Sequence, residues 1–340
     1  MRVKILHKRA ITAQKRALTS PTNKFELFSK LPEPELPDLC VIKINTMEKV
    51  WFITGSSRGL GRSLTEAVLA GGATVAATAR NPQQLDDLKQ KYPGRILPLQ
   101  LDVTDNTQIQ HAVDQTVKKF GRIDVVVNNA GFGITGAAEA YTEAQVRSQL
   151  DTNLYAPIAI TRAVLPVMRK QKFGYILQIS SIGGRVGNAG LSMYQAAKFG
   201  LGGFSEALAK EVAPLGIHVT SVEPGGFRTD WGSASMSFAP EVQGYETTVG
   251  WMIQHLRSGS FVPMGDPAKA AKVMIQLVED PAPPVHLVLG SEAADFLQQA
   301  DANRKAEFEK WLPVTKSTDH DDAENFLESE AGKTLLKTRS

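Results

Sequence analysis

The sequence has little of several things, and each absence excludes a class of protein. Cys40 is the one cysteine, so no disulfide can form within the chain, which fits a reducing, cytoplasmic location. No apolar run approaches the roughly 18 residues of a membrane-spanning helix. Basic residues do not alternate with aromatic ones, so we expect neither a nucleic-acid nor a membrane partner. The six histidines form no His-x-x-x-His pattern, and we assign no metal.

Positive charge is concentrated at the start of the chain. Residues 1–24 carry seven basic side chains and no acidic one, although the net charge of the whole sequence is only +3. Residues 1–46 close with a run broken by prolines, which disfavours regular structure. A basic start of this kind fits an organelle transit peptide, the alternative to a cytoplasmic protein. We favour an upstream extension with Met47 as the natural start, and in either case a disordered or loosely attached, non-catalytic segment.

The remaining sequence alternates short apolar runs with amphipathic segments. This alternation predicts an α/β fold, a Rossmann-type doubly wound parallel sheet of about seven strands with helices on both faces. We expect residues 47–312 to form a single domain and 313–340 a polar C-terminal tail. The predicted strands are 49–54, 73–80, 96–101, 124–128, 175–180, 218–223 and 286–290. Long helices are predicted at 143–170, 192–213 and 293–311, and another opens at Asn81-Pro82.

A glycine-rich turn joins the first predicted strand to a helix. Its Gly-x-x-x-Gly-x-Gly spacing departs from the Gly-x-Gly-x-x-Gly of the dinucleotide-binding fingerprint. Free N–H groups and the dipole at a helix N-terminus attract phosphate, and glycines let the backbone approach it closely. A turn without a ligand is the alternative. The predicted pyrophosphate site comprises Gly55, Ser57, Arg58, Gly59, Leu60 and Gly61.

The end of the second predicted strand indicates which dinucleotide binds. An acid there would bind the adenosine ribose and select NAD, but Ala79 takes this place and Arg80 follows. Arg58 lies near the same ribose, and two guanidiniums without a carboxylate favour a 2′-phosphate. We therefore predict NADP(H) in preference to NAD(H). The alternative is that one or both arginines point to solvent.

Further cofactor contacts are expected where later strands end. Asp102 and Val103 follow the third strand and are placed to contact adenine. Asn128 ends the fourth strand, and Asn129, Ala130 and Gly131 follow it. Small residues there would admit the cofactor, while the asparagines would fix the backbone.

Tyr194 and Lys198 stand four residues apart on a predicted helix. This spacing puts both side chains on one face, one turn apart. A phenol beside a fixed ammonium is a tuned proton donor, because the positive charge lowers the pKa of the tyrosine. Ser181 follows the fifth predicted strand, at the sheet edge where open α/β proteins bind ligands.

Residues 230–264 are the least regular part of the predicted domain. Aromatic residues and methionines alternate there with glycine and serine. We favour a mobile apolar flap over a substrate, and an ordinary helical excursion packed on the core is the alternative. The aromatic content suggests a moderately apolar ketone, aldehyde or alcohol as the small-molecule substrate.

These motifs in this order resemble the single-domain branch of the short-chain dehydrogenase/reductase family. The resemblance runs from about Glu48 to Gly290, and the stretch Glu223–Trp231 is similar to a poorly characterised subgroup of these oxidoreductases. The motifs that carry it are Thr54–Gly61, Asn128–Gly131, Asn153, Ser181 and Tyr194-x-x-x-Lys198.

The resemblance implies an NADP(H)-dependent oxidoreductase that interconverts a carbonyl and an alcohol. Tyr194 would donate the proton, Ser181 would bind the same oxygen, and Lys198 would also meet the nicotinamide ribose. Asn153 would hold a water that links Lys198 to solvent. A homodimer or homotetramer through the two long helices is implied. Residues that would meet the nicotinamide end are Tyr194, Lys198, Pro224, Gly225, Phe227 and Thr229.

Two other functions compete with this interpretation. A sensor or scaffold that binds the cofactor without catalysis needs only the fold. An epimerase or dehydratase acting on a nucleotide sugar would use the same Tyr and Lys but needs a substantial C-terminal substrate domain. Only about 110 residues follow Pro224, which disfavours that class.

Overall fold

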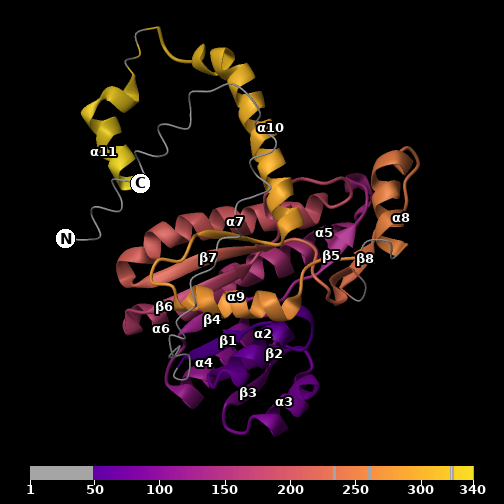
Figure 1. The fold of residues 1–340 in the computed structure, drawn as a ribbon, viewed down its shortest axis with the longest axis vertical. Helices are drawn as coiled ribbons and strands as arrows, with labels where there is room; N and C mark the ends of the chain where they lie inside the picture. The colour runs from indigo at the N-terminus through magenta and orange to yellow at the C-terminus, as the bar shows by residue number, and fades with distance from the viewer. Residues whose placement is uncertain (1–48, 233–234, 259–261, 322, 324, 340) are drawn as a thin grey trace, which may run out of the picture. The chain divides into compact units, whose positions relative to one another are not determined.

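The structure, a computed structural model, describes residues 49–340 apart from 233–234, 259–261, 322, 324 and 340 (Figure 1). The extension predicted at 1–46 lies outside the described residues. No helix among the described residues has both the length and the apolar character needed to cross a membrane.

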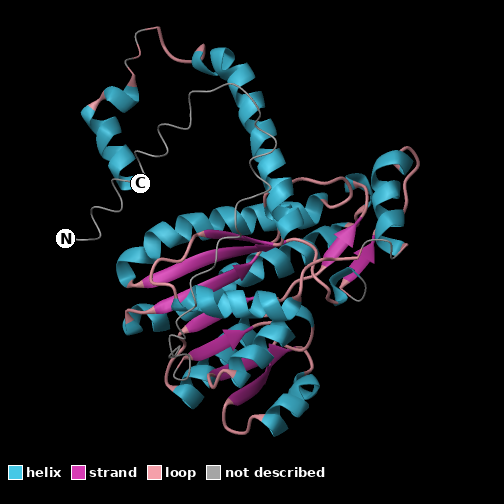
Figure 2. Ribbon diagram, in the orientation of Figure 1, coloured by secondary structure: helices cyan, strands magenta, loops and turns pink. Residues whose placement is uncertain are grey.

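A seven-stranded parallel sheet forms the centre of the fold (Figure 2). Its spatial order is β3-β2-β1-β4-β6-β7-β9, and every pairing is parallel. This confirms the predicted α/β fold. The strand order turns back between β1 and β4, the switch point where such sheets bind ligands. The strands are β1 Val50–Ile53, β2 Thr74–Ala79, β3 Ile96–Gln100, β4 Val125–Asn128, β6 Gly174–Ile179, β7 Ile217–Pro224 and β9 His286–Leu289.

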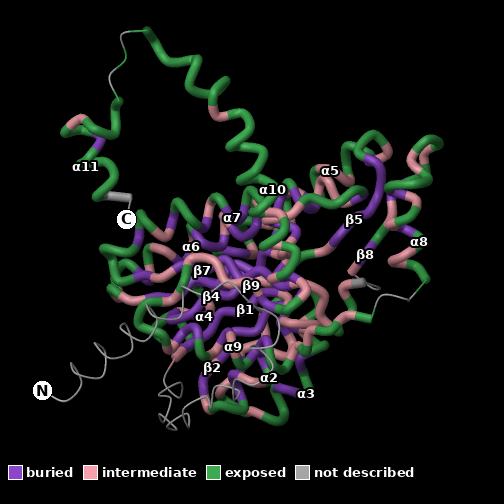
Figure 3. Tube along the Cα trace, turned by 45° about the horizontal axis from the view of Figure 1, so that its top comes forward, coloured by how far each residue is buried: buried purple, intermediate pink, exposed green. Residues whose placement is uncertain are grey.

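Helices cover both faces of the sheet, because alternate side chains of each strand point to opposite sides. Trp51 and Ile53 of β1 pack with α2 (Gly59–Ala70) and α9 (Pro267–Glu279). Phe52 between them packs into a second cluster on the other face. Figure 3 shows the strands buried between these layers. The helices of the second face are α4 Asn106–Phe120, α6 Ala156–Gln171 and α7 Ser192–Val212.

The long helix predicted at 143–170 is present but is not uniform. It consists of α5 (Glu143–Leu150) and α6, joined by a single π-helical turn, η5 (Asp151–Tyr155). Pro157 has no N–H to donate to the carbonyl four residues earlier, on Asn153, which favours wider hydrogen bonding at this point. Asn153, a predicted catalytic residue, lies in this π-helical turn.

Two short strands were not predicted. β5 (Gly133–Thr135) and β8 (Met236–Phe238) pair in parallel and tie the segment 230–264 to the main domain. The described part of that segment also contains η8 (Asp230–Gly232), η9 (Glu246–Gly250) and α8 (Trp251–Arg257). The described part of this segment therefore combines short helices with one strand, and a flap over the substrate stays a prediction.

The ends of several predicted helices also differ. The helix expected to open at Asn81-Pro82 is a 3₁₀ turn, η3 (Pro82–Leu85), followed by α3 (Asp86–Lys91). The terminal helix α10 (Ser291–Lys316) extends past residue 312, and α11 (Glu330–Arg339) lies within the predicted polar tail. The remaining short helical turns are η4 Ala138–Ala140, η6 Ile182–Gly184, η7 Ala213–Leu215 and η10 Phe326–Glu328.

Asp124, fully buried just before β4, provides a stability test. Its carboxylate accepts from the Val50 backbone at 2.8 Å and from Arg122 at 2.6 Å, so it joins the starts of β1 and β4. Asp124→Ala leaves the Val50 N–H unpaired, and we expect a loss of about 2 kcal/mol in the free energy of unfolding. Thermal unfolding measures this loss. Asp295→Ala on exposed α10 is the control, and equal effects of the two substitutions would contradict the assignment.

Candidate active site

The glycine turn between β1 and α2 requires glycine at three positions. Gly55 and Gly59 have φ of +67° and +58°, which other residues rarely adopt. A Cβ at Gly61 would overlap the Asn129 side chain and the Gly55 carbonyl. No side chain caps the first turn of α2, so its N–H groups face the turn without a side-chain acceptor. The geometry fits a phosphate group.

Hydrogen bonds fix this turn against the end of β4. Asn129 Nδ2 donates to the carbonyls of Thr54 at 2.9 Å and Gly55 at 3.2 Å. Thr54 Oγ1 in turn accepts from the N–H groups of Asn129 at 2.9 Å and Ala130 at 3.0 Å. Asn128 Nδ2 donates to Gln178 Oε1 at 2.9 Å. Asn129 therefore fixes the backbone of the turn, while Asn128 bonds a side chain of the neighbouring strand β6.

Arg58 and Arg80 are both exposed, at the glycine turn and just after β2. Neither guanidinium has an ion-pair or hydrogen-bond partner within the part of the chain that the structure describes. Arg62 on α2, by contrast, is bound by Glu66 and Asp87. At the next strand end, the Asp102 carboxylate accepts from Thr104, and Val103 is buried.

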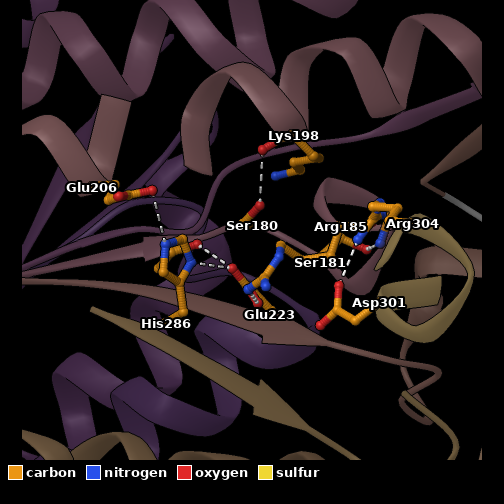
Figure 4. Close-up of polar contacts among 11 residues, drawn as sticks. Ser180, Ser181, Arg185, Lys198, Glu206, Glu223, His286, Asp301 and Arg304 are labelled. Carbon is orange, nitrogen blue, oxygen red and sulfur yellow. Dashed lines mark hydrogen bonds and ion pairs between the residues drawn. The ribbon is translucent and has the colours of Figure 1, made fainter. Parts of the chain in front are cut away.

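Ser181, Tyr194 and Lys198 meet where β6 ends and α7 begins. Ser181 hydrogen-bonds Tyr194, whose residue surface is 5% exposed. The Lys198 ammonium lies 5.7 Å from the Tyr194 ring centroid and donates to the Ile179 carbonyl at 2.7 Å. Figure 4 shows Ser181 and Lys198 near each other at this edge of the sheet. The structure thus brings these three predicted residues together.

The expected lowering of the Tyr194 pKa by Lys198 is wrong for this state of the protein. Burial raises the pKa of Tyr194 to about 12, and only the Ser181 hydrogen bond opposes that rise. Burial also lowers the pKa of Lys198 to about 8. The Lys198 ammonium donates to the Ile179 carbonyl rather than to the phenol. The burial of Tyr194, which raises its pKa, therefore outweighs the effect of the Lys198 charge.

Asn153 is fully buried on η5, and its side chain holds the backbone beyond β4. Its Nδ2 donates to the Phe132 carbonyl at 2.9 Å, and its Oδ1 accepts from the Phe132 N–H at 3.3 Å. A Cβ at Gly131 would press on the same oxygen. Both polar atoms of the side chain are therefore committed to the loop after Ala130.

The loop after β7 closes the other side of the site. Thr229 lies against the glycine turn, since a Cβ on Gly59 would be 3.6 Å from the Thr229 Cβ. The Gly226 N–H donates to Glu292 at 2.6 Å, and Gly225 packs on Ala293, both on α10. Phe227 packs into the core beside α2 and α9, and Pro224 ends β7. Every predicted nicotinamide-end residue therefore lies along this edge of the sheet.

Two residues of the site were predicted only as parts of longer stretches, without a contact of their own. Thr54 forms the hydrogen bonds described above, and its hydroxyl directly before Gly55 was the available signal. Trp231 packs on Tyr194 with 5.5 Å between ring centroids. An aromatic residue two positions after Thr229 gave no indication of which side chain it would cover. Among the described residues, no group of His, Cys, Asp and Glu is arranged to hold a metal ion.

Comparisons with known proteins agree with this geometry. The model of the short chain dehydrogenase family matches residues 49–238. The chain belongs to this family. It is 46% identical to the oxidoreductase BOA17 of Botryotinia fuckeliana over 79% of this chain and 98% of that one. It is 35% identical to the uncharacterized oxidoreductase C162.03 of Schizosaccharomyces pombe over 80% and 92%.

A solved structure gives the same result. A short-chain dehydrogenase from Streptomyces avermitilis is 42% identical, with a TM-score of 0.76 over 80% of this chain and 99% of that one. The protein is therefore a member of a family of oxidoreductases that use a nicotinamide cofactor.

The Lys198 environment predicts a pH dependence of stability. Because its pKa is about 8 in the folded protein and 10.5 otherwise, the unfolded chain binds more protons between these values. Stability therefore rises with pH there. Relative to Lys198→Met, the cofactor-free protein should gain about 2 kcal/mol between pH 8 and pH 10.

Urea unfolding at each pH measures this gain. Lys118→Met, on the exposed last turn of α4, is the matched control and should follow the unsubstituted protein. A Lys198→Met profile parallel to that of the unsubstituted protein would contradict the burial of the charge.

Proposed function

We propose that this protein is an NADP(H)-dependent oxidoreductase that interconverts a carbonyl and an alcohol, with Tyr194 as proton donor and acceptor. The observation that carries the proposal is the meeting of Ser181, Tyr194 and Lys198 at one buried point of the sheet edge. These three side chains lie at the same edge of the sheet as the glycine turn, which is beside the switch between β1 and β4.

Each side chain has a distinct part in the proposed reaction. Tyr194 carries its proton at neutral pH, since its pKa is about 12, and gives it to the carbonyl oxygen. Ser181 donates to the same oxygen and stabilises the charge that develops there. The bound nicotinamide supplies or takes the hydride. Lys198 stabilises the phenolate that remains, one helical turn away.

Proton return completes the proposal. A water held by Asn153 would link Lys198 to solvent. Each polar side-chain atom of Asn153 has one partner on Phe132, so such a water would use the remaining lone pair or N–H of the amide, or the main chain of this residue.

The cofactor preference rests on Arg58 and Arg80. Two exposed guanidiniums and no carboxylate at the end of β2 favour NADP(H). The remaining contacts are proposed from the same edge of the sheet. They are Gly55, Ser57, Gly59, Leu60, Gly61, Asp102, Val103, Asn129, Ala130, Gly131, Pro224, Gly225, Phe227 and Thr229.

The substrate is proposed to be a moderately apolar carbonyl or alcohol. Trp231 packs on Tyr194, and the Met236 thioether, close to both Gly133 and Trp231, accepts from Thr135. These side chains give the proton donor an apolar surround. A homodimer or homotetramer through α5–α6 and α7 is also proposed, since Tyr155 and Phe199 expose 60% and 44% of their surface.

Tyr194→Phe tests the proton donor. Turnover of carbonyls with NADPH should fall by at least about 10³-fold, because the variant lacks the phenol proton that the carbonyl oxygen takes up. NADPH binding, measured by fluorescence titration, should change less than about threefold. Tyr92→Phe, remote from the site at the end of α3, is the control. Retained activity in Tyr194→Phe would remove Tyr194 from its role as proton donor.

Arg58→Ala with Arg80→Ala tests the cofactor preference. Each lost charged hydrogen bond is worth about 1.5–3 kcal/mol, so the NADPH dissociation constant should rise on the order of 100-fold or more. The NADH constant should stay within about threefold. Arg147→Ala on exposed α5 controls for net charge. Equal weakening of both cofactors would refute the 2′-phosphate assignment.

A further inference from the structure

A buried carboxylate near the site has no part in the proposed chemistry. Glu223 precedes the last residue of β7 and is 1% exposed. Its oxygens lie 2.7 Å from His286 Nδ1, 3.1 Å from Ser221 Oγ and 3.2 Å from an Arg185 nitrogen (Figure 4). A buried charge is retained only where partners compensate its desolvation. We call Arg185, Ser221, Glu223 and His286 the Glu223 network.

The Glu223 network connects elements far apart in the sequence. His286 lies on β9, and its Nε2 is 3.9 Å from Glu206 on α7. The Arg185 carbonyl accepts a hydrogen bond from Arg304 on α10, which also pairs with Asp301 at 2.7 Å. The network therefore joins two strands and two helices to the segment that carries Arg185.

That segment is η6 (Ile182–Gly184), the tight turn between Ser181 and Arg185, with Arg185 as its C-cap. The Gly184 N–H donates to the Ser181 carbonyl at 2.8 Å, and the Arg185 N–H to the Ile182 carbonyl at 2.9 Å. The Gly183 N–H donates to Ser181 Oγ at 3.0 Å. A turn bonded in this way moves as one piece, so the position of Arg185 sets that of Ser181.

The turn also touches the other two members of the site. A Cβ at Gly184 would lie 2.9 Å from the Lys198 carbonyl and 2.7 Å from Ser180 Oγ, so there is no room for one. A Cβ at Gly183 would lie 3.4 Å from Cε1 of Tyr194. A displacement of η6 would therefore disturb Ser181 and Tyr194 together.

We propose that Glu223, Arg185 and His286 are positioning residues that hold η6, and with it Ser181, against Tyr194 and Lys198. This role rests on the proposed function, since it assigns a purpose to the position of Ser181. The proposal predicts that loss of the Glu223 charge frees the turn without affecting the distant glycine turn.

Hydrogen exchange tests the positioning without any substrate. In Glu223→Gln, the amides of residues 183–186 should exchange at least about tenfold faster, because each donates a hydrogen bond that the network supports. The control is Glu279→Gln, which breaks the 2.6 Å ion pair between Lys49 and the end of α9, at the opposite ends of the strands. Unchanged exchange in Glu223→Gln, or equal acceleration in both variants, would overturn the proposal.

Kinetics test the consequence. With a carbonyl that the unsubstituted enzyme reduces, Glu223→Gln should lower kcat about 10- to 100-fold, as misplacement by about an ångström does. The NADPH dissociation constant should remain within about threefold, and Glu279→Gln should keep kcat. Arg185→Lys, which keeps the charge, should recover much of the activity that Arg185→Gln loses. If Glu223→Gln does not fold, Arg185→Lys and Arg185→Gln test the positioning role in its place.

The two possible failures are distinguishable. An unsubstituted protein that reduces no carbonyl would refute the proposed function, while the exchange experiment still decides the positioning role. Normal kcat in folded Glu223→Gln, or a parallel loss of kcat and NADPH affinity, would overturn the positioning role alone.

Discussion

The side chain of Asn129 holds the glycine turn against the end of β4, at the point where the strand order reverses. The carbonyls of Thr54 and Gly55, directly after β1, accept from its amide, and Gly61 has no room for a side chain because the same amide lies there. The Thr54 hydroxyl accepts in return from the N–H groups of Asn129 and Ala130. Polar contacts between the ends of β1 and β4 therefore fix the edge of the sheet where the cofactor is proposed to bind. The positions of α2 and Arg58 depend on these contacts.

The sheet was predictable because its strands are buried on both faces. Segments such as 50–53 and 125–128 are continuous apolar runs, which parallel strands require and surface segments do not tolerate. The start of the helix predicted at 143–170 was correct, because Thr142 directly before it is a local capping signal. The meeting of Ser181 with Tyr194 followed from topology, since both stand at carboxyl ends of the sheet or just beyond it.

What the sequence did not reveal depends on contacts between distant residues. β5 and β8 have three residues each, too few to show the alternation of apolar and polar residues that marks a strand. They pair in parallel, with Gly133 opposite Met236, a residue far away in the sequence. An acid as the last residue of the predicted strand 218–223 was the one sign of Glu223, and its partners Arg185 and His286 stand 38 and 63 positions away. The predicted direction of the shift in the Tyr194 pKa was wrong for a similar reason. Spacing on a helix places two side chains on one face but does not say how much water reaches them.

Burial of the tyrosine and lysine bears on the direction of the proposed reaction. A phenol with a pKa of about 12 keeps its proton throughout the physiological range, so the described state is ready to donate to a carbonyl oxygen. Oxidation of an alcohol needs phenolate, which the same burial disfavours. Lys198, with a pKa of about 8, is still mostly charged at neutral pH and can stabilise phenolate only after the proton has left. Desolvation therefore keeps the proton on Tyr194 in the described state.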